Sequence, residues 1–279
     1  MFINFKKMEK VHQFYEDKSK KLFIILGAFF VTNAVIAELI GVKVFSLEKT
    51  FGLQPFHLSL FGLDDLSFNL TVGVLLWPVV FVMTDIINEY FGVRGVRLLS
   101  WIAAAMIAYS FIMFWIGMHL VPADFWLTSH LHHDMPPEQL NSLKSKVGDL
   151  NEAFRLIFGQ SSWIIIGSLV AFLVGQIVDV MSFHKIKQYT GERYIWLRAT
   201  GSTLISQFID SFVVLFIAFY IGADWTLKAV IAIGIMNYIY KFIIAVVLTP
   251  VIYIIHEVIE KYLGEELATK MKNQSLHYK

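Results

Sequence analysis

Six long apolar stretches dominate this sequence, and each is long enough to cross the hydrocarbon core of a membrane as a helix. Of the 23 Lys and Arg and 22 Asp and Glu residues, only six fall inside these stretches. A helix in a soluble core would need a polar face, and the stretch 98–121 has none. We therefore expect an all-α integral membrane protein with six transmembrane helices. The stretches are approximately residues 22–42, 71–92, 98–121, 161–183, 199–222 and 229–256.

The composition agrees with this fold class and excludes several functions. Apolar residues make up 57% of the chain and charged residues 16%, against about 25% charged residues in a soluble domain. A formal net charge of +1 excludes a strongly basic nucleic-acid-binding protein. The absence of cysteine excludes disulfides, thiolate metal sites and thiol catalysis. A membrane barrel would need alternating segments of about 10 residues, whereas these runs are continuous and longer.

The Lys and Arg residues outside the helices predict the orientation. Sixteen lie on the side that holds both termini and six on the opposite side, so both termini should be cytoplasmic. Residues 1–21 are too polar for a cleavable signal peptide and form a cytoplasmic arm. We expect the six-helix domain to occupy 22–256, and a short cytoplasmic helix with a tail to occupy 257–279.

Two outer connections are long enough to fold. Residues 43–70 contain short alternating apolar runs broken by Gly and Pro, which favours a hairpin or a re-entrant turn. Residues 122–160 contain an expected amphipathic helix from Pro137, which would lie on the membrane surface or cap the bundle. Its apolar positions are Leu140, Leu143, Val147, Leu150, Phe154 and Ile157.

Ionisable residues inside a membrane are costly, so each is a candidate functional residue. Asp85, Asn88 and Glu89 are spaced to share one face of the second helix, and Pro78 should kink that helix. The two carboxyl groups and the amide could bind a cation, take a proton or accept hydrogen bonds from a polar solute. For Glu89 the alternative is a side chain that extends to the cytoplasmic surface.

A second group of candidates lies on the last three helices. Gln176 and Asp179 share a face of the fourth helix, and Gln207 and Asp210 repeat this spacing in the fifth. Asp210 and Lys241 both lie near the middle of their stretches, so we expect a buried ion pair. Asn237 is one turn from Lys241. The pair could be purely structural, or it could open when a substrate or a proton binds.

Other polar and aromatic residues point less clearly to function. Glu38 and Asn33 are expected at the outer interface. Three tryptophans near polar helix ends could stack on a flat heterocycle: Trp77, Trp163 and Trp196. The sequence has no P-loop, Ser202 has no histidine nearby in sequence, and a histidine cluster lacks metal-ligand spacing: His130, His132 and His133. We expect no metal, no cofactor and no enzymatic activity.

A set of motifs within residues 78–253 resembles the VUT or queuosine precursor transporter family. The motifs are P-x-x-F-x-x-T-D-I-I-N-E-x-x-G at 78–92, W-L-R-x-x-x-S-T-x-x-S-Q-x-x-D at 196–210, Y-K at 240–241 and T-P-x-x-Y at 249–253. The resemblance implies a six-helix protein of the bacterial inner membrane that imports 7-cyano- and 7-aminomethyl-7-deazaguanine. A carboxylate can accept the adjacent N1–H and 2-amino donors of such a base, and an amide can serve its O6 side.

On this resemblance we expect a secondary transporter with its site among helices two, four, five and six. Asp179, Gln207 and Asp210 would recognise the base, with Gln176 and Asn237 beside them, and Lys241 would balance charge or gate. Asp85, Asn88 and Glu89 would form the inner gate or a proton site. The expected partners are the bilayer and a purine-like small molecule, without nucleic acid, and a homo-oligomer stays open.

Two alternatives remain from the sequence. The chain could be a substrate-binding membrane subunit, for a vitamin or a nucleobase, that works with a separate ATPase. It could also be an intramembrane enzyme that uses its carboxylates on a lipid-soluble substrate.

Overall fold

The computed structural model describes residues 17–126, 148–160, 162–190 and 194–277, together with residues 136, 138, 139, 141, 142 and 145. Most of this described chain is helical. Five helical stretches in it are long and apolar enough to cross a membrane: Lys18–Ile40, Trp77–His119, Leu150–Thr190, Trp196–Ile221 and Leu227–Leu263.

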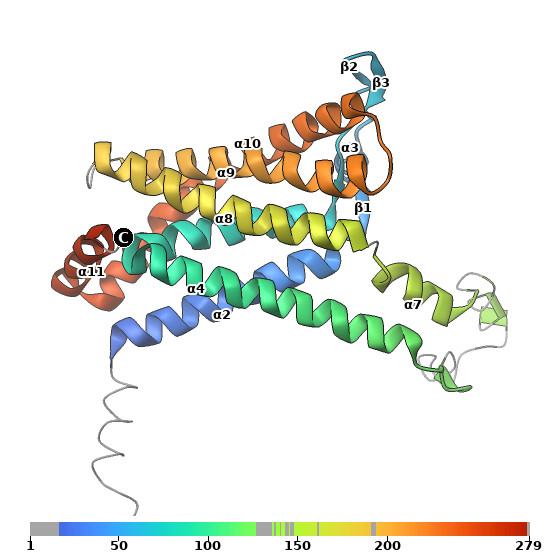
Figure 1. Cartoon of the computed structure of the whole chain (residues 1–279), viewed down its shortest axis with the longest axis horizontal. Coiled ribbons are helices and arrows are strands. Elements are labelled where there is room, and N and C mark those ends of the chain that lie inside the picture. Colours follow the sequence, from blue (N-terminus) through green and yellow to red (C-terminus); the bar gives the residue numbers. More distant parts are fainter. Residues whose placement is uncertain are drawn as a thin grey trace, which may run out of the picture.

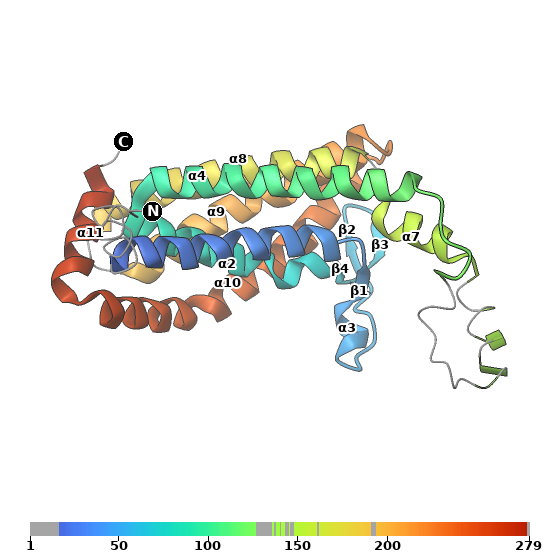
Figure 2. The same cartoon turned by 90° about the horizontal axis from the view of Figure 1, so that it is seen from below.

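The long helices form a bundle with folded segments at both ends (Figure 1; Figure 2). α8 packs along α9, α2 along α4, and α10 along α9. A short helix, α11 (Glu265–His277), covers one end, and the strands and α7 (Leu150–Phe158) lie at the other. The bundle helices are α2 (Lys18–Ile40), α4 (Trp77–His119), α8 (Ser162–Thr190), α9 (Ile195–Leu215) with its π-helical extension η2 (Phe216–Ile221), and α10 (Leu227–Leu263).

α4 turns back on itself at Gly92. This residue has φ 67° and ψ −172°, a conformation outside the helical region that is essentially restricted to glycine. Thr84 and Ser100 are 16 residues apart, which would be about 24 Å along a straight helix. Both nevertheless donate hydrogen bonds to Oε1 of Gln176, at 2.9 and 3.4 Å. α4 therefore consists of two legs, 77–91 and 93–119, which cover most of the expected second and third stretches.

Two helix starts differ from the sequence-based boundaries. α2 begins at Lys18, inside the expected arm 1–21, because the Asp17 carboxylate accepts hydrogen bonds from the backbone N–H groups of Ser19 and Lys20. α4 begins at Trp77, so Pro78 lies in its first turn. A proline there removes no helical hydrogen bond. The expected kink at Pro78 is therefore wrong, and the reversal occurs at Gly92.

Residues 43–71 form a strand hairpin. β1 (Val44–Ser46) pairs antiparallel with β4 (Asn69–Thr71), and β2 (Leu58–Leu60) pairs with β3 (Leu63–Leu66). Between them, α3 (Leu47–Thr50) carries Glu48, which accepts hydrogen bonds from the Phe68 N–H at 2.8 Å and Ser46 Oγ at 3.2 Å. Burial raises the pKa of Glu48, but these hydrogen bonds outweigh it and leave the pKa below its ordinary value. A 3-10 turn, η1 (Val72–Leu75), joins the hairpin to α4.

The continuous amphipathic helix expected from Pro137 to Ile157 is wrong in its second half. Gly148 has φ 64°, and a new helix, α7, begins at Leu150 with the Asp149 carboxylate capping Asn151 and Glu152. The glycine and the cap interrupt the helix because both favour a chain reversal over helix continuation. Pro137, Leu140, Leu143 and Val147 lie outside the described residues.

The core lies between α2, the two legs of α4, and α8. Phe30, Ile86, Ile107 and Phe172 are at most 1% exposed within it. The opposite faces of the same helices leave large apolar side chains such as Trp101 and Trp115 about 60% exposed. A soluble monomer rarely leaves so much contiguous apolar surface in water, so this surface suits contact with lipid.

Candidate functional site

α9 carries the polar face around which the site is built. Arg198, Ser202, Thr203, Ser206 and Gln207 recur at helical spacing and are all at most 5% exposed. Apolar residues such as Ile205 and Phe208 occupy the outer face. Because the helix turns every 3.6 residues, this pattern alone directs the polar side chains into the bundle.

Asp85 on α4 and Asp179 on α8 both contact the hydroxyl groups of this face. Asp85 accepts hydrogen bonds from Ser202 Oγ at 3.0 Å and Thr203 Oγ1 at 2.9 Å. Asp179 accepts one from Ser206 Oγ at 2.8 Å, and its Oδ2 has no partner among the described residues. Both side chains are at most 1% exposed. The structure therefore brings together two candidates that the sequence assigned to different roles.

Glu89 lies in a buried cluster of charges. Its Oε1 is 2.6 Å from Arg198 Nη2, its Oε2 is 3.2 Å from Lys187 Nζ, and all three side chains are at most 1% exposed. The alternative in which Glu89 extends to the surface is therefore wrong. Ser275 of α11 donates a hydrogen bond to the Glu89 carbonyl oxygen at 2.8 Å, so α11 covers this end of the site.

Sequence reasoning missed Arg198 and Lys187 as site residues. Both were assigned to the cytoplasmic connection, because the expected helices ended at 183 and restarted at 199. α8 continues to Thr190 and α9 starts at Ile195, so both cations lie on helices that reach into the protein. The available signal was charge complementarity, since Glu89 needs a cation once it is buried.

Gln176 and Asn88 are buried beside these groups. Gln176 joins the two α4 legs to α8 through Thr84 and Ser100, and its Nε2 has no partner in the described chain. Asn88 is 1% exposed, and neither its Oδ1 nor its Nδ2 is hydrogen-bonded to a described residue. Gln176 thus has a packing contact that the sequence did not predict.

The expected pair of Asp210 and Lys241 is confirmed. Lys241 Nζ on α10 lies 2.6 Å from Asp210 Oδ2 on α9, with the side chains 7% and 14% exposed. The pair joins α9 to α10 next to the pocket described below. Asn237, one turn away on α10, is half-buried and does not line that pocket.

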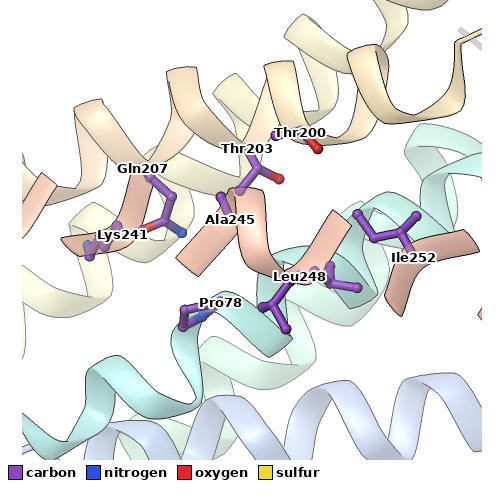
Figure 3. A pocket seen from close by; sticks show the side chains of 9 residues that line it. Pro78, Thr200, Thr203, Gln207, Lys241, Ala245, Leu248 and Ile252 are labelled. Carbon is purple, nitrogen blue, oxygen red and sulfur yellow. The ribbon is translucent and has the colours of Figure 1, made fainter. Parts of the chain in front are cut away.

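A pocket with an empty volume of about 310 Å³ opens between α4, α9 and α10 (Figure 3). This volume includes space open to the surroundings, and the part that a water-sized group can occupy is only about 10 Å³, so the helices must move apart before the pocket can hold a base. Gln207 points into the pocket beside Lys241, and neither atom of its side-chain amide has a hydrogen-bond partner in the described chain. The lining residues are Pro78, Val82, Thr200, Thr203, Gln207, Lys241, Ala245, Leu248 and Ile252. The pocket thus offers a few convergent polar groups on an apolar wall.

Several other candidates lie elsewhere. Glu38 is 7% exposed and accepts a hydrogen bond from Ser168 of α8, so its expected place at the interface is wrong. Asn33 donates to the Phe29 carbonyl oxygen of its own helix. The three tryptophans, Trp77, Trp163 and Trp196, do not line the pocket. The histidine cluster of residues 130, 132 and 133 lies outside the described residues, which contain no group of side chains suited to a metal ion.

Comparisons with known proteins show what the chain resembles. A family model described as "Putative vitamin uptake transporter" matches residues 71–255. A "Probable queuosine precursor transporter" of Bacillus subtilis is 27% identical over 70% of this chain and 72% of its own length. Its namesake in Haemophilus influenzae is 26% identical over 86% and 89%. The "Queuosine precursor transporter" of Escherichia coli is 27% identical over 65% and 70%. No solved structure matches significantly.

Proposed function

This chain belongs to the vitamin uptake transporter family, and on that premise we propose that it is a secondary transporter that imports queuosine precursors. The substrates are 7-cyano-7-deazaguanine and 7-aminomethyl-7-deazaguanine. The relatives named as queuosine precursor transporters support the substrate class. The structural observation that supports the proposal most directly concerns Gln207. Its side-chain amide is buried in the pocket, and both its donor and its acceptor are unpartnered among the described residues.

Gln207 suits one edge of a guanine-like base. Its carbonyl oxygen can accept the N1–H of the base while its amide nitrogen donates to O6, so both orphan atoms are satisfied at once. A buried polar group left without a partner costs free energy, and a ligand that supplies the partner recovers it. The apolar residues Val82, Leu248 and Ile252 then contact the faces of the ring.

Asp210 and Lys241 provide charge beside the same pocket. Lys241 lines it, and Asp210 holds the lysine ammonium group at 2.6 Å. A substrate carbonyl oxygen can compete for the lysine, while the Asp210 carboxylate becomes free to accept the 2-amino group. The pair thus acts in recognition and gating, with Asn237 one turn away on α10.

At the opposite end of the polar face, Glu89 with Arg198 and Lys187 forms the inner gate. The three charges are buried against each other, and α11 covers them through Ser275. Asn88, buried next to Glu89 with its amide unpartnered in the described chain, is the residue we assign to contact the substrate on its way to this gate. The gate must open for release, because the ion pairs join α4, α8 and α9 at one level.

The protein crosses the bacterial inner membrane six times with both termini in the cytoplasm. Counting the two legs of α4 separately gives six crossings from the five long apolar stretches. The start of α2 and the whole of α11 lie at the same end of the bundle (Figure 2). The excess of Lys and Arg on that side supports its assignment to the cytoplasm.

Uptake of labelled 7-cyano-7-deazaguanine by a strain unable to make it tests this function. We expect accumulation only when the gene is present. Purified protein in liposomes should also exchange labelled for unlabelled precursor without any added ATPase, and the recovered solute should be chemically unchanged. Exchange that needs a separate ATPase subunit would contradict the secondary mechanism, and a modified product would show an enzyme instead.

A further inference from the structure

The polar face of α9 contacts two carboxyl groups through hydroxyl groups that lie within two helical turns. Asp85 contacts Ser202 and Thr203, and Asp179 contacts Ser206. Their side chains are 1% and 0% exposed, and the three hydroxyl groups that they contact lie within residues 202–206 of α9. They come from different helices, α4 and α8, so the fold rather than local sequence places them together.

In the described part of the chain, neither carboxyl group has a cation in contact. Within the described residues, no Lys, Arg or His lies within ion-pair distance of Asp85 or Asp179. The ionisable groups of the surrounding helices are engaged elsewhere: Glu89 contacts Arg198 and Lys187, Asp210 contacts Lys241, and His256 contacts Tyr90. His184 lies near Lys187 and Glu89. Two like charges buried together without a cation cannot both persist, so the pair must hold a proton or another cation.

The hydrogen-bond pattern favours a proton. Ser202 Oγ lies 3.0 Å from both Asp85 Oδ1 and the Ala199 carbonyl oxygen, and Ser206 Oγ lies 2.8 Å from Asp179 Oδ1 and 3.0 Å from the Thr203 carbonyl oxygen. Each hydroxyl has one hydrogen for two acceptors. A protonated carboxyl group removes this shortage of hydrogens. The carboxyl O–H donates to the hydroxyl oxygen, and the hydroxyl O–H then donates to the backbone carbonyl oxygen.

Thr203 connects these carboxyl groups to the pocket. Its Oγ1 is 2.9 Å from Asp85 Oδ2, and the same residue lines the pocket beside Gln207. An ionised Asp85 binds the Thr203 hydrogen. A protonated Asp85 has one hydrogen, which it can carry on Oδ1 toward Ser202 or on Oδ2 toward Thr203; in the second position it donates to Oγ1 and frees the Thr203 hydrogen for an acceptor on the substrate. Protonation and substrate binding therefore favour each other through one side chain.

We propose that Asp85 and Asp179 form a shared proton-binding site, linked to the substrate pocket by Thr203, that drives import of the precursor with protons. This inference rests on the proposed function and specifies the coupling ion. One proton moves inward on a carboxyl group together with the substrate and leaves to the cytoplasm after release. By linkage, protons that raise substrate affinity are themselves bound more tightly when substrate is present.

Binding and transport by the purified full-length protein test the proposal. The probe is 7-cyano-7-deazaguanine, which is uncharged near neutral pH. We expect its affinity for the wild type to be about tenfold higher at pH 6 than at pH 8, within the usual range of coupling between two sites. In liposomes, an inward proton gradient should drive accumulation, and adding precursor should acidify a trapped pH-sensitive dye.

Asp85→Asn and Asp179→Asn should both lose gradient-driven accumulation and the pH dependence of precursor affinity. Thr203→Val should flatten the pH dependence of affinity, because valine has the shape of threonine without the hydroxyl. Glu257→Gln, at an exposed carboxylate on α10, is the matched control and should behave as wild type. If the Asp variants do not fold, acidification of the trapped dye by the wild-type protein tests the proton coupling instead.

Three results would overturn the coupling. They are accumulation driven by a sodium gradient instead of a proton gradient, affinity independent of pH, and net uptake by the wild type into precursor-free liposomes without dye acidification. Each leaves precursor exchange, and so the proposed function, intact. The proposed function itself fails only if the wild type neither binds nor exchanges the precursor.

Discussion

Glu89 of α4 and Arg198 of α9 are 109 positions apart in sequence and form a buried ion pair of 2.6 Å, with side chains at most 1% exposed. Lys187 of α8 contacts the other oxygen of the same carboxylate at 3.2 Å. Three helices are thus joined through one side chain, and this junction is covered by α11. Its loss should affect both stability and the closing of the inner end.

Glu89→Gln should therefore destabilise the protein. The substitution removes the negative charge that both cations contact while they remain buried, and breaking such a pair costs about 3–5 kcal/mol of unfolding free energy. Thermal unfolding in detergent measures the loss. The control, Glu257→Gln, removes a carboxylate 65% exposed and paired with Lys261, and should leave the unfolding free energy almost unchanged. Equal effects of the two variants would contradict a buried structural junction.

Variants of the ion pair between Asp210 and Lys241 should show different effects on stability and on transport. Asp210→Asn alone leaves the Lys241 charge without its partner and should lower both stability, by about 3–5 kcal/mol, and precursor uptake. The double variant with Asp210→Asn and Lys241→Met removes both charges and should recover most of the stability without the uptake. Expression, thermal unfolding and labelled uptake are the measurements. Full uptake by either variant would show that the pair is only structural.

Gly92 should tolerate no side chain. Its φ of 67° is unfavourable for other residues, and a Cβ there would lie 3.1 Å from the Ser275 carbonyl oxygen. Gly92→Ala should therefore cost about 1–3 kcal/mol of stability and expose α11 to protease. Gly117→Ala is the control, because a Cβ at that helical position meets only Phe154 atoms at 4.0 Å. A variant at Gly92 as stable as this control would show that the turn is relaxed.

The contribution of Glu48 should depend on pH. Its pKa is lower in the folded protein than its ordinary value of 4.5, so the carboxylate stabilises the hairpin fully above that value. The contribution is lost as the pH falls through the folded pKa. Amide hydrogen exchange of Phe68, whose N–H binds Glu48, should show falling protection below about pH 4.5 in wild type and little change in Glu48→Gln. Asp65→Asn, in the same hairpin, should keep the wild-type profile.

The sequence predicted features that depend on one helix at a time. Charge-free runs located the long helices, and depth along them placed Asp210 level with Lys241. The sequence-based predictions were wrong for features that depend on contacts between helices. Lys187 and Arg198 were assigned to a loop because hydropathy ends a helix at its first charges, whereas a buried Glu89 draws both inward. The partners of Asp85 and Asp179 were also missed, because the helical spacing of the Ser and Thr residues on α9 indicates a polar face but not which helices pack against it.

Gln207 provides the sharpest test of the pocket because binding and stability should change in opposite directions. Both atoms of its amide are buried without a partner in the described chain, so Gln207→Leu should raise the unfolding free energy of the empty protein by about 1–3 kcal/mol. The same change should lower precursor affinity at least about tenfold, the loss expected for one good hydrogen bond.

The matched control is Gln176→Leu, a buried amide whose Oε1 accepts hydrogen bonds from Thr84 and Ser100. Removing it leaves the buried Ser100 hydroxyl without this acceptor, while Thr84 keeps the Val80 carbonyl oxygen at 3.0 Å, so stability should fall by about 1–3 kcal/mol. Thermal unfolding without precursor and equilibrium binding of labelled precursor measure the two effects. If Gln207→Leu destabilises the protein as Gln176→Leu does, then Gln207 is a packing residue. Unchanged affinity in Gln207→Leu would place the precursor outside this pocket, because a buried amide that contacts the base cannot be replaced by an isobutyl group without loss.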